Sequence, residues 1–158
     1  MRLTFSMIVT LICAFAACSN KGVNPTNEND PTGLKNVWWK VQSFESIYGD
    51  TITLVSEEGY SVFFADSSIT SNPDSIYGTF NLRGKTDSLC RNIYYSTYRI
   101  TGSDSIFVDP ITTTKVACRS SYMQYLQALE SAASFQVSNN VLTIYQAGGV
   151  RKLIFSKQ

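Results

Sequence analysis

From Leu34 to Ser156 the chain is a succession of short runs of β-branched and aromatic residues, separated by turn residues. Runs of this length and composition predict β-strands rather than helices. Two pairs of runs flank the turns at Glu58-Gly59 and Gly148-Gly149, and each pair predicts a β-hairpin. The predicted strands are Val37–Val41, Thr51–Leu54, Tyr60–Phe64, Ile76–Leu82, Ile93–Ile100, Ser105–Val108, Val141–Tyr145 and Val150–Phe155.

One segment, Ser120–Ala133, departs from this pattern and predicts a helix. Its apolar residues recur at helical spacing, which places them on one face that packs against the sheet. These residues are Tyr122, Tyr125, Leu126, Leu129 and Ala133. Strands, then one helix, then a hairpin predict an α+β fold: a small curled, barrel-like antiparallel β-sheet with one covering helix near residues 120–133.

The N-terminus has the layout of a secretory signal, with the cation Arg2, an apolar run and small residues before a cysteine. The stretch Phe15-Ala16-Ala17-Cys18 resembles the lipobox of bacterial lipoproteins, whose cysteine is lipidated and whose new amine is acylated. A transmembrane anchor is one alternative, but the apolar run falls short of the roughly 20 residues that span a bilayer. The other alternative is an ordinary cleaved signal that happens to contain a cysteine.

These features divide the chain into three parts. Residues 1–17 are expected to be a signal peptide that is removed. Residues 18–33 comprise the lipidated Cys18, carrying palmitate or similar acyl chains, and a tether rich in Asn, Pro, Thr and Gly. Residues 34–158 form one folded domain. The expected location is the bacterial cell envelope, with the outer membrane as the expected membrane and its face left open.

Two cysteines fall within the domain, Cys90 and Cys118. In an exported chain such a pair predicts a disulfide, although two free thiols remain the alternative. The bond would close a loop of about 29 residues, which contributes roughly 3.5 kcal/mol in the chain-entropy model.

Composition restricts the chemistry. The chain contains no histidine, which excludes Ser-His-Asp and Cys-His catalysis and histidine-ligated metal sites. Its 13 basic and 12 acidic residues are nearly balanced, which argues against a nucleic-acid partner. An enzyme built on carboxylates, Lys or Tyr remains possible on composition alone, although the commonest general base is missing. No catalytic residue, metal site or cofactor is predicted from these residues.

The motifs at Cys90–Asn92 and Thr114–Cys118 resemble those of the META/HslJ domain family. Thr114–Cys118 resembles the family's T-x-M-A-C motif, and Cys90–Asn92 resembles its upstream Gly-Cys-Asn segment. Tyr125–Leu129 matches its helix, while Leu142–Ile144 and Leu153–Phe155 match its closing hairpin. The resemblance implies a small antiparallel, barrel-like sheet with one helix and no catalytic activity. It also implies envelope or secreted proteins associated with heat shock, novobiocin resistance, motility or secretion.

The leading hypothesis is therefore a non-enzymatic, membrane-anchored envelope lipoprotein with a stress-associated or binding role. Its expected partners are the membrane, through the anchor, and an envelope protein or a small apolar ligand. One alternative is a lipid- or small-molecule-binding module that uses the barrel interior. Another is a hydrolase, which would need two carboxylates that face each other across a cleft, about 5–10 Å apart.

The best candidates for a binding surface are aromatic residues of the predicted strand Ile93–Ile100. Tyr94 and Tyr98 share one face of this strand, and Tyr95 lies on the other. We expect the helix to cover one face of the sheet, and we place Tyr94 and Tyr98 on the free face as binding residues.

Overall fold

The computed structural model describes residues 30–46, 48, 51–52, 59–69, 80–86, 91–114 and 120–158. The predicted signal peptide, the lipidation site Cys18, most of the tether and the cysteines Cys90 and Cys118 lie outside the described residues. Within the described ranges, no helix is both long enough and apolar enough to cross a bilayer.

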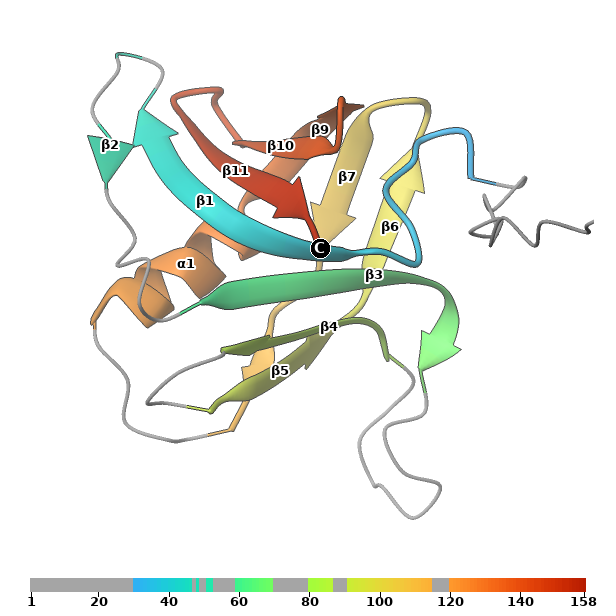
Figure 1. The fold of residues 1–158 in the computed structure, drawn as a ribbon, viewed down its shortest axis with the longest axis horizontal. Helices are drawn as coiled ribbons and strands as arrows, with labels where there is room; N and C mark the ends of the chain where they lie inside the picture. The colour runs from blue at the N-terminus through green and yellow to red at the C-terminus, as the bar shows by residue number, and fades with distance from the viewer. Residues whose placement is uncertain are drawn as a thin grey trace, which may run out of the picture.

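One curled antiparallel sheet dominates the fold (Figure 1). The strands are β1 (Trp38–Ser46), β2 (Thr51–Ile52), β3 (Tyr60–Ile69), β4 (Phe80–Thr86), β5 (Ile93–Ser96), β6 (Tyr98–Thr101), β7 (Ser105–Val108), β8 (Thr112–Thr113), β9 (Ala132–Ser138), β10 (Val141–Gln146) and β11 (Arg151–Lys157). Their order in the sheet is β6-β7-β9-β10-β11-β1-β3-β4-β5-β8, and β2 pairs with β1 beside this path. The hairpin predicted around Gly148-Gly149 is confirmed, because β10 pairs with β11. The hairpin predicted around Gly59 differs from the prediction, because Thr51–Ile52 pairs with β1 rather than with β3.

A break at Thr97 brings the two ends of the strand order together. The sequence predicted one continuous strand from Ile93 to Ile100, but Thr97 separates β5 from β6, which lie near opposite ends of the order. The amide of Asn81 in β4 bridges this seam: its nitrogen donates to the Tyr98 carbonyl (3.0 Å), and its oxygen accepts from the Tyr98 N–H (2.8 Å). A side chain thus supplies the hydrogen bonds that a neighbouring backbone would supply in a regular ladder.

Helix α1 (Ser120–Glu130) lies at one end of the curled sheet (Figure 1). Its predicted apolar face is confirmed, since Tyr122, Tyr125, Leu126 and Leu129 are all buried. The predicted end at Ala133 is wrong, because Ala132 pairs with Gln146 and begins β9. The expected curled antiparallel sheet with one helix near residues 120–133 is confirmed for the described part of the chain. Because α1 has only 11 residues and strands make up most of the described elements, the expected α+β class is only loosely supported.

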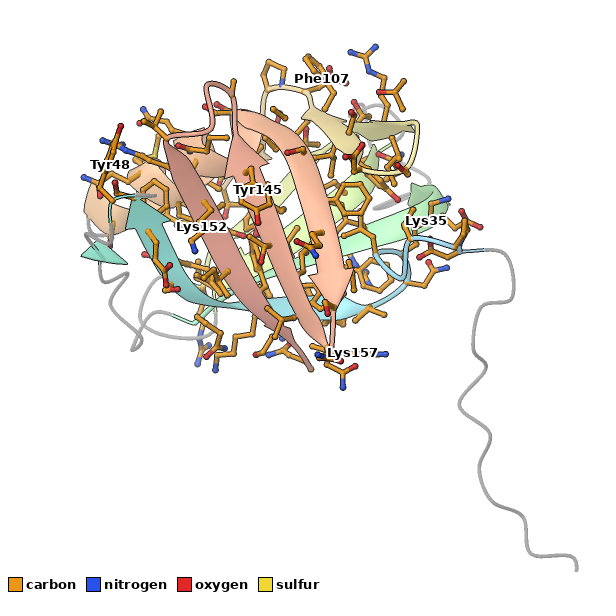
Figure 2. All side chains as sticks on the ribbon, turned by 90° about the horizontal axis from the view of Figure 1, so that it is seen from above. Lys35, Tyr48, Phe107, Tyr145, Lys152 and Lys157 are labelled. Atoms are coloured by element: carbon orange, nitrogen blue, oxygen red, sulfur yellow. The ribbon has the colours of Figure 1, made fainter. Side chains whose placement is uncertain are left out.

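Large side chains from the inner face of the sheet and from α1 form one core. Trp39, Phe64, Leu82 and Phe155 are almost completely inaccessible to solvent, as are the tyrosines described below. The strands alternate as a half-buried sheet requires, with inner residues in the core and outer residues facing solvent. On the outer face of β10 and β11, for example, Tyr145 and Lys152 lie side by side (Figure 2).

An ion pair and a backbone hydrogen bond connect the segment before β1 to β3. Lys35 forms an ion pair with Asp66 (2.7 Å), and the Asn36 N–H donates to the Phe64 carbonyl (2.7 Å). The Asp30 carboxylate accepts from the N–H groups of Thr32 and Lys35. Burial raises the pKa of Asp30, but the hydrogen bonds from Thr32 and Lys35 outweigh that effect, and the pKa lies below its ordinary value.

Candidate functional site

The two tyrosines predicted to bind a partner lie in the core. Tyr94 is 0% and Tyr98 is 6% exposed, so the expectation that they form a free surface is wrong. Tyr94 and Tyr98 do lie on the same face of the segment Ile93–Ile100, as predicted, but this face points into the core and not to solvent. The Tyr98 hydroxyl donates to the Ala65 carbonyl (2.8 Å), which ties the ring to β3.

Tyr94 belongs to a buried cluster with Tyr60, Tyr122 and Tyr125. Its hydroxyl donates to the Ser61 carbonyl (2.8 Å) and lies 2.5 Å from the Tyr125 hydroxyl. The rings of Tyr60 and Tyr125 stack with centroids 4.8 Å apart. Burial raises the pKa of Tyr94 well above its ordinary value and also raises the pKa values of Tyr122 and Tyr125. These hydroxyls therefore stay protonated at neutral pH and join the helix to the sheet.

The barrel interior is filled by side chains. Trp39, Tyr60, Phe64, Leu82 and Tyr94 belong to one contiguous buried cluster with the apolar face of α1. This packing gives no support to the alternative in which a lipid or small molecule occupies the interior.

A cleft of about 490 Å³ opens instead beside the outer flank of α1. Phe44 and Ala128 are its buried apolar residues, and Arg151 lies over the Phe44 ring at 5.8 Å. Amide and hydroxyl groups supply the rest of the lining. The lining residues are Phe44, Gln124, Gln127, Ala128, Ser131, Gln146 and Arg151.

The cleft has the chemistry of a binding site for a polar ligand. Each glutamine amide both donates and accepts hydrogen bonds, and the guanidinium of Arg151 donates only. None of the lining residues is a carboxylate. Sequence analysis missed this site because its residues come from β1, α1, β10, β11 and the turn that follows α1. The local signal for the site was the position of Gln124 and Gln127 on the flank of the predicted helix.

Two of the described carboxylates form ion pairs and do not line the cleft. Glu45 pairs with Lys152 (3.1 Å), and Asp66 pairs with Lys35 (2.7 Å). Hydrogen bonds from Ser43 and Lys152 hold the pKa of Glu45 below its ordinary value. In the part of the chain that the structure describes, no three His, Cys, Asp or Glu side chains gather in a way that could hold a metal ion.

The sequence model of the META domain family matches residues 75–158 of this chain. The chain belongs to the META domain family. The match begins just before β4, so β1 to β3 precede it while completing the same sheet. No curated protein matches the sequence.

Two solved structures resemble the fold of this META-domain protein. A protein from Burkholderia xenovorans, determined by NMR, has a TM-score of 0.56 at 15% identity, over 79% of this chain and 83% of its own. A DUF4847 family protein from Bacteroides vulgatus, determined by crystallography, has a TM-score of 0.53 at 14% identity, over 78% of this chain and 93% of its own. At these identities the likeness concerns the fold alone.

Proposed function

We propose that this protein is a non-enzymatic lipoprotein of the bacterial cell envelope, anchored through acyl chains on Cys18, whose META domain binds a polar envelope component. The cleft beside α1 is the binding site. Its lining of amides and one guanidinium around Phe44 is the observation that carries the binding role.

The arrangement suits recognition better than catalysis. An aromatic floor with a few polar groups that converge on it is the usual make-up of a ligand site. General acid–base chemistry would need a titratable group near neutral pH, and the cleft lining supplies none. The ligand therefore carries hydrogen-bonding groups, with an acceptor placed opposite Arg151.

The anchor places this site at a membrane. Arg2, the apolar run and Cys18 support export and lipidation, and residues 18–33 supply the lipidated cysteine and the proposed tether. Several acyl chains give stable attachment where a single chain gives only reversible binding. The outer membrane is the proposed location, and a stress-associated role follows from the resemblance to META/HslJ proteins.

Photocrosslinking in intact cells tests the binding role. A crosslinking residue replaces Gln127 in the cleft, and a control places the same residue at Gln136, which is exposed on β9 outside the cleft. We expect a defined adduct from position 127 that is absent from position 136 and is lost when Arg151→Ala is added. The absence of an adduct, or the same adducts from both positions, would reject the cleft as the binding site.

A further inference from the structure

Four side chains form a continuous row across the outer face of the sheet, here called the outer row. Trp38 lies opposite Phe63, Phe63 opposite Arg83, and Arg83 opposite Tyr95, on the adjacent strands β1, β3, β4 and β5 (Figure 1). Their chain neighbours Trp39, Phe64, Leu82 and Tyr94 point into the core, so the row faces outward. All four members are half-buried.

The guanidinium of Arg83 lies over two adjacent rings of this row. Its guanidinium carbon lies 5.2 Å from the centroid of Trp38 and 4.9 Å from that of Phe63. Its Nε atom is buried and has no hydrogen-bond partner, and no described carboxylate forms an ion pair with the side chain. Aromatic contacts fix the guanidinium in place, but they do not neutralise its charge.

The neighbouring row adds to the positive charge. Lys40 and Lys85 lie on either side of Ser61, and Lys85 Nζ lies 5.3 Å from the Trp38 ring centroid. The described residues of the two rows thus include three cations and no carboxylate. An anionic partner fits the outer row.

The chain enters the domain next to this row. The Asn36 N–H binds the carbonyl of Phe64, the residue that follows Phe63 of the row. Only about a dozen residues join Cys18 to Asp30, and they reach at most ~40 Å when fully extended. A domain attached at this point can bring β1, β3 and β4 against the membrane that holds its anchor.

We propose that the outer row docks on the surface of that membrane and binds its anionic lipid headgroups. The rings of Trp38 and Tyr95 lie at the level of the headgroups, where amphipathic aromatic side chains are favoured. Arg83 and the adjacent lysines bind the phosphate groups, as basic residues do at anionic bilayers. The proposal rests on the proposed lipid anchor for its setting, and it leaves the α1 cleft free for its ligand.

Vesicle binding without acyl chains tests the surface by itself. The protein is the chain from Cys18 to Gln158 carrying Cys18→Ser, which includes every described residue. It is mixed with vesicles of phosphatidylcholine alone or with added phosphatidylglycerol, and binding is measured by co-sedimentation. We expect binding only to the vesicles that contain phosphatidylglycerol, with affinity that falls as salt is added.

Matched variants locate the binding surface. Arg83→Gln should weaken vesicle binding about fivefold, which is the contribution of one basic residue to affinity for an anionic membrane. Arg99→Gln is the control, because Arg99 also stacks on a ring, Phe107 at 4.4 Å, but lies on β6 outside the row. It should change binding by less than about twofold. Melting curves of both variants establish that any loss is not a loss of folding.

Three outcomes would overturn the proposal: equal binding to both vesicle types, no vesicle binding at all, or equal losses in Arg83→Gln and Arg99→Gln. An oligo-glutamate peptide distinguishes another occupant, since Arg83-dependent peptide binding without vesicle binding would assign the row to an acidic protein. Because the tested protein has no acyl chains, these results are independent of whether Cys18 is lipidated in the cell.

Discussion

The ring of Tyr94 lies so closely over Gly84 that a Cβ atom at position 84 would stand 1.8 Å from Tyr94 Cζ. The two residues are direct partners on β4 and β5, and both face the core. The missing side chain of Gly84 gives the ring its place, as when an aromatic residue covers a glycine in a sheet. From there the Tyr94 hydroxyl reaches Ser61 and Tyr125, so this contact connects the sheet with helix α1.

Gly84→Ala should therefore destabilise the protein strongly. The added methyl group must displace the Tyr94 ring, and we expect the free energy of unfolding in urea to fall by about 3 kcal/mol or more. In the double variant Gly84→Ala/Tyr94→Ala the obstruction is absent, so the two losses should be less than additive. Additive losses would show that the clash with the Tyr94 ring does not determine how much Gly84→Ala lowers the free energy of unfolding.

Alkaline pH should unfold the protein through its buried tyrosines. Burial raises the pKa values of Tyr94, Tyr98, Tyr122 and Tyr125 above the ordinary value of 10.0. In the unfolded chain these groups ionise near pH 10, while in the folded protein they keep their protons. The contribution of these tyrosines to stability is therefore fully present below about pH 10, and it is lost as the pH rises from there through their raised pKa values in the folded protein.

Urea unfolding at a series of pH values measures this effect. Each buried tyrosine contributes a decrease of up to about 1.4 kcal/mol per pH unit above pH 10. Tyr94→Phe removes one such group, so its stability should fall less steeply with pH. A wild-type stability that stays constant well above pH 10 would contradict the assignment.

The two sides of α1 should respond differently to truncation. Leu126 is 3% exposed in the core, and Leu126→Ala should cost about 2–5 kcal/mol. Gln124 and Gln127 are exposed beside the cleft, and their replacement by Ala should change stability by less than about 0.5 kcal/mol. Thermal melting of the three variants checks both values, and similar losses in all three would contradict the placement of the helix.

Much of the fold was predictable because it is encoded locally. The buried face of α1 follows from the spacing of Tyr122, Leu126 and Leu129, and the hairpin of β10 and β11 follows from its glycine turn. The end of the helix was not predictable in this way. Residues Ala132 and Ala133 favour helix, but pairing between β9 and β10 determines their conformation.

The candidate sites depend on contacts between distant segments. Alternation along Ile93–Ile100 places Tyr94 and Tyr98 together, but it does not tell which face is inside when both faces carry aromatic residues. The small residue that admits the Tyr94 ring, Gly84, lies on another strand. The outer row likewise exists only through the register of four strands.

The pair Cys90 and Cys118 remains a predicted disulfide that lies outside the described residues. Mass mapping of unreduced protein should find the two cysteines in one crosslinked peptide. If the bond is present, Cys118→Ser should lower the free energy of unfolding by about 2–5 kcal/mol. Complete alkylation of both thiols in freshly isolated, unreduced protein would instead establish that they are free.

Membrane anchoring at Cys18 is the central claim, and mass analysis of the N-terminal peptide from the membrane fraction tests it most directly. We predict a peptide that begins at Cys18 and carries acyl chains on its sulfur and its amine. With Cys18→Ala, we predict that the protein leaves the membrane fraction or keeps residues 1–17. A mature peptide with an unmodified Cys18, or a normally processed Cys18→Ala variant that stays on the membrane, would contradict the account.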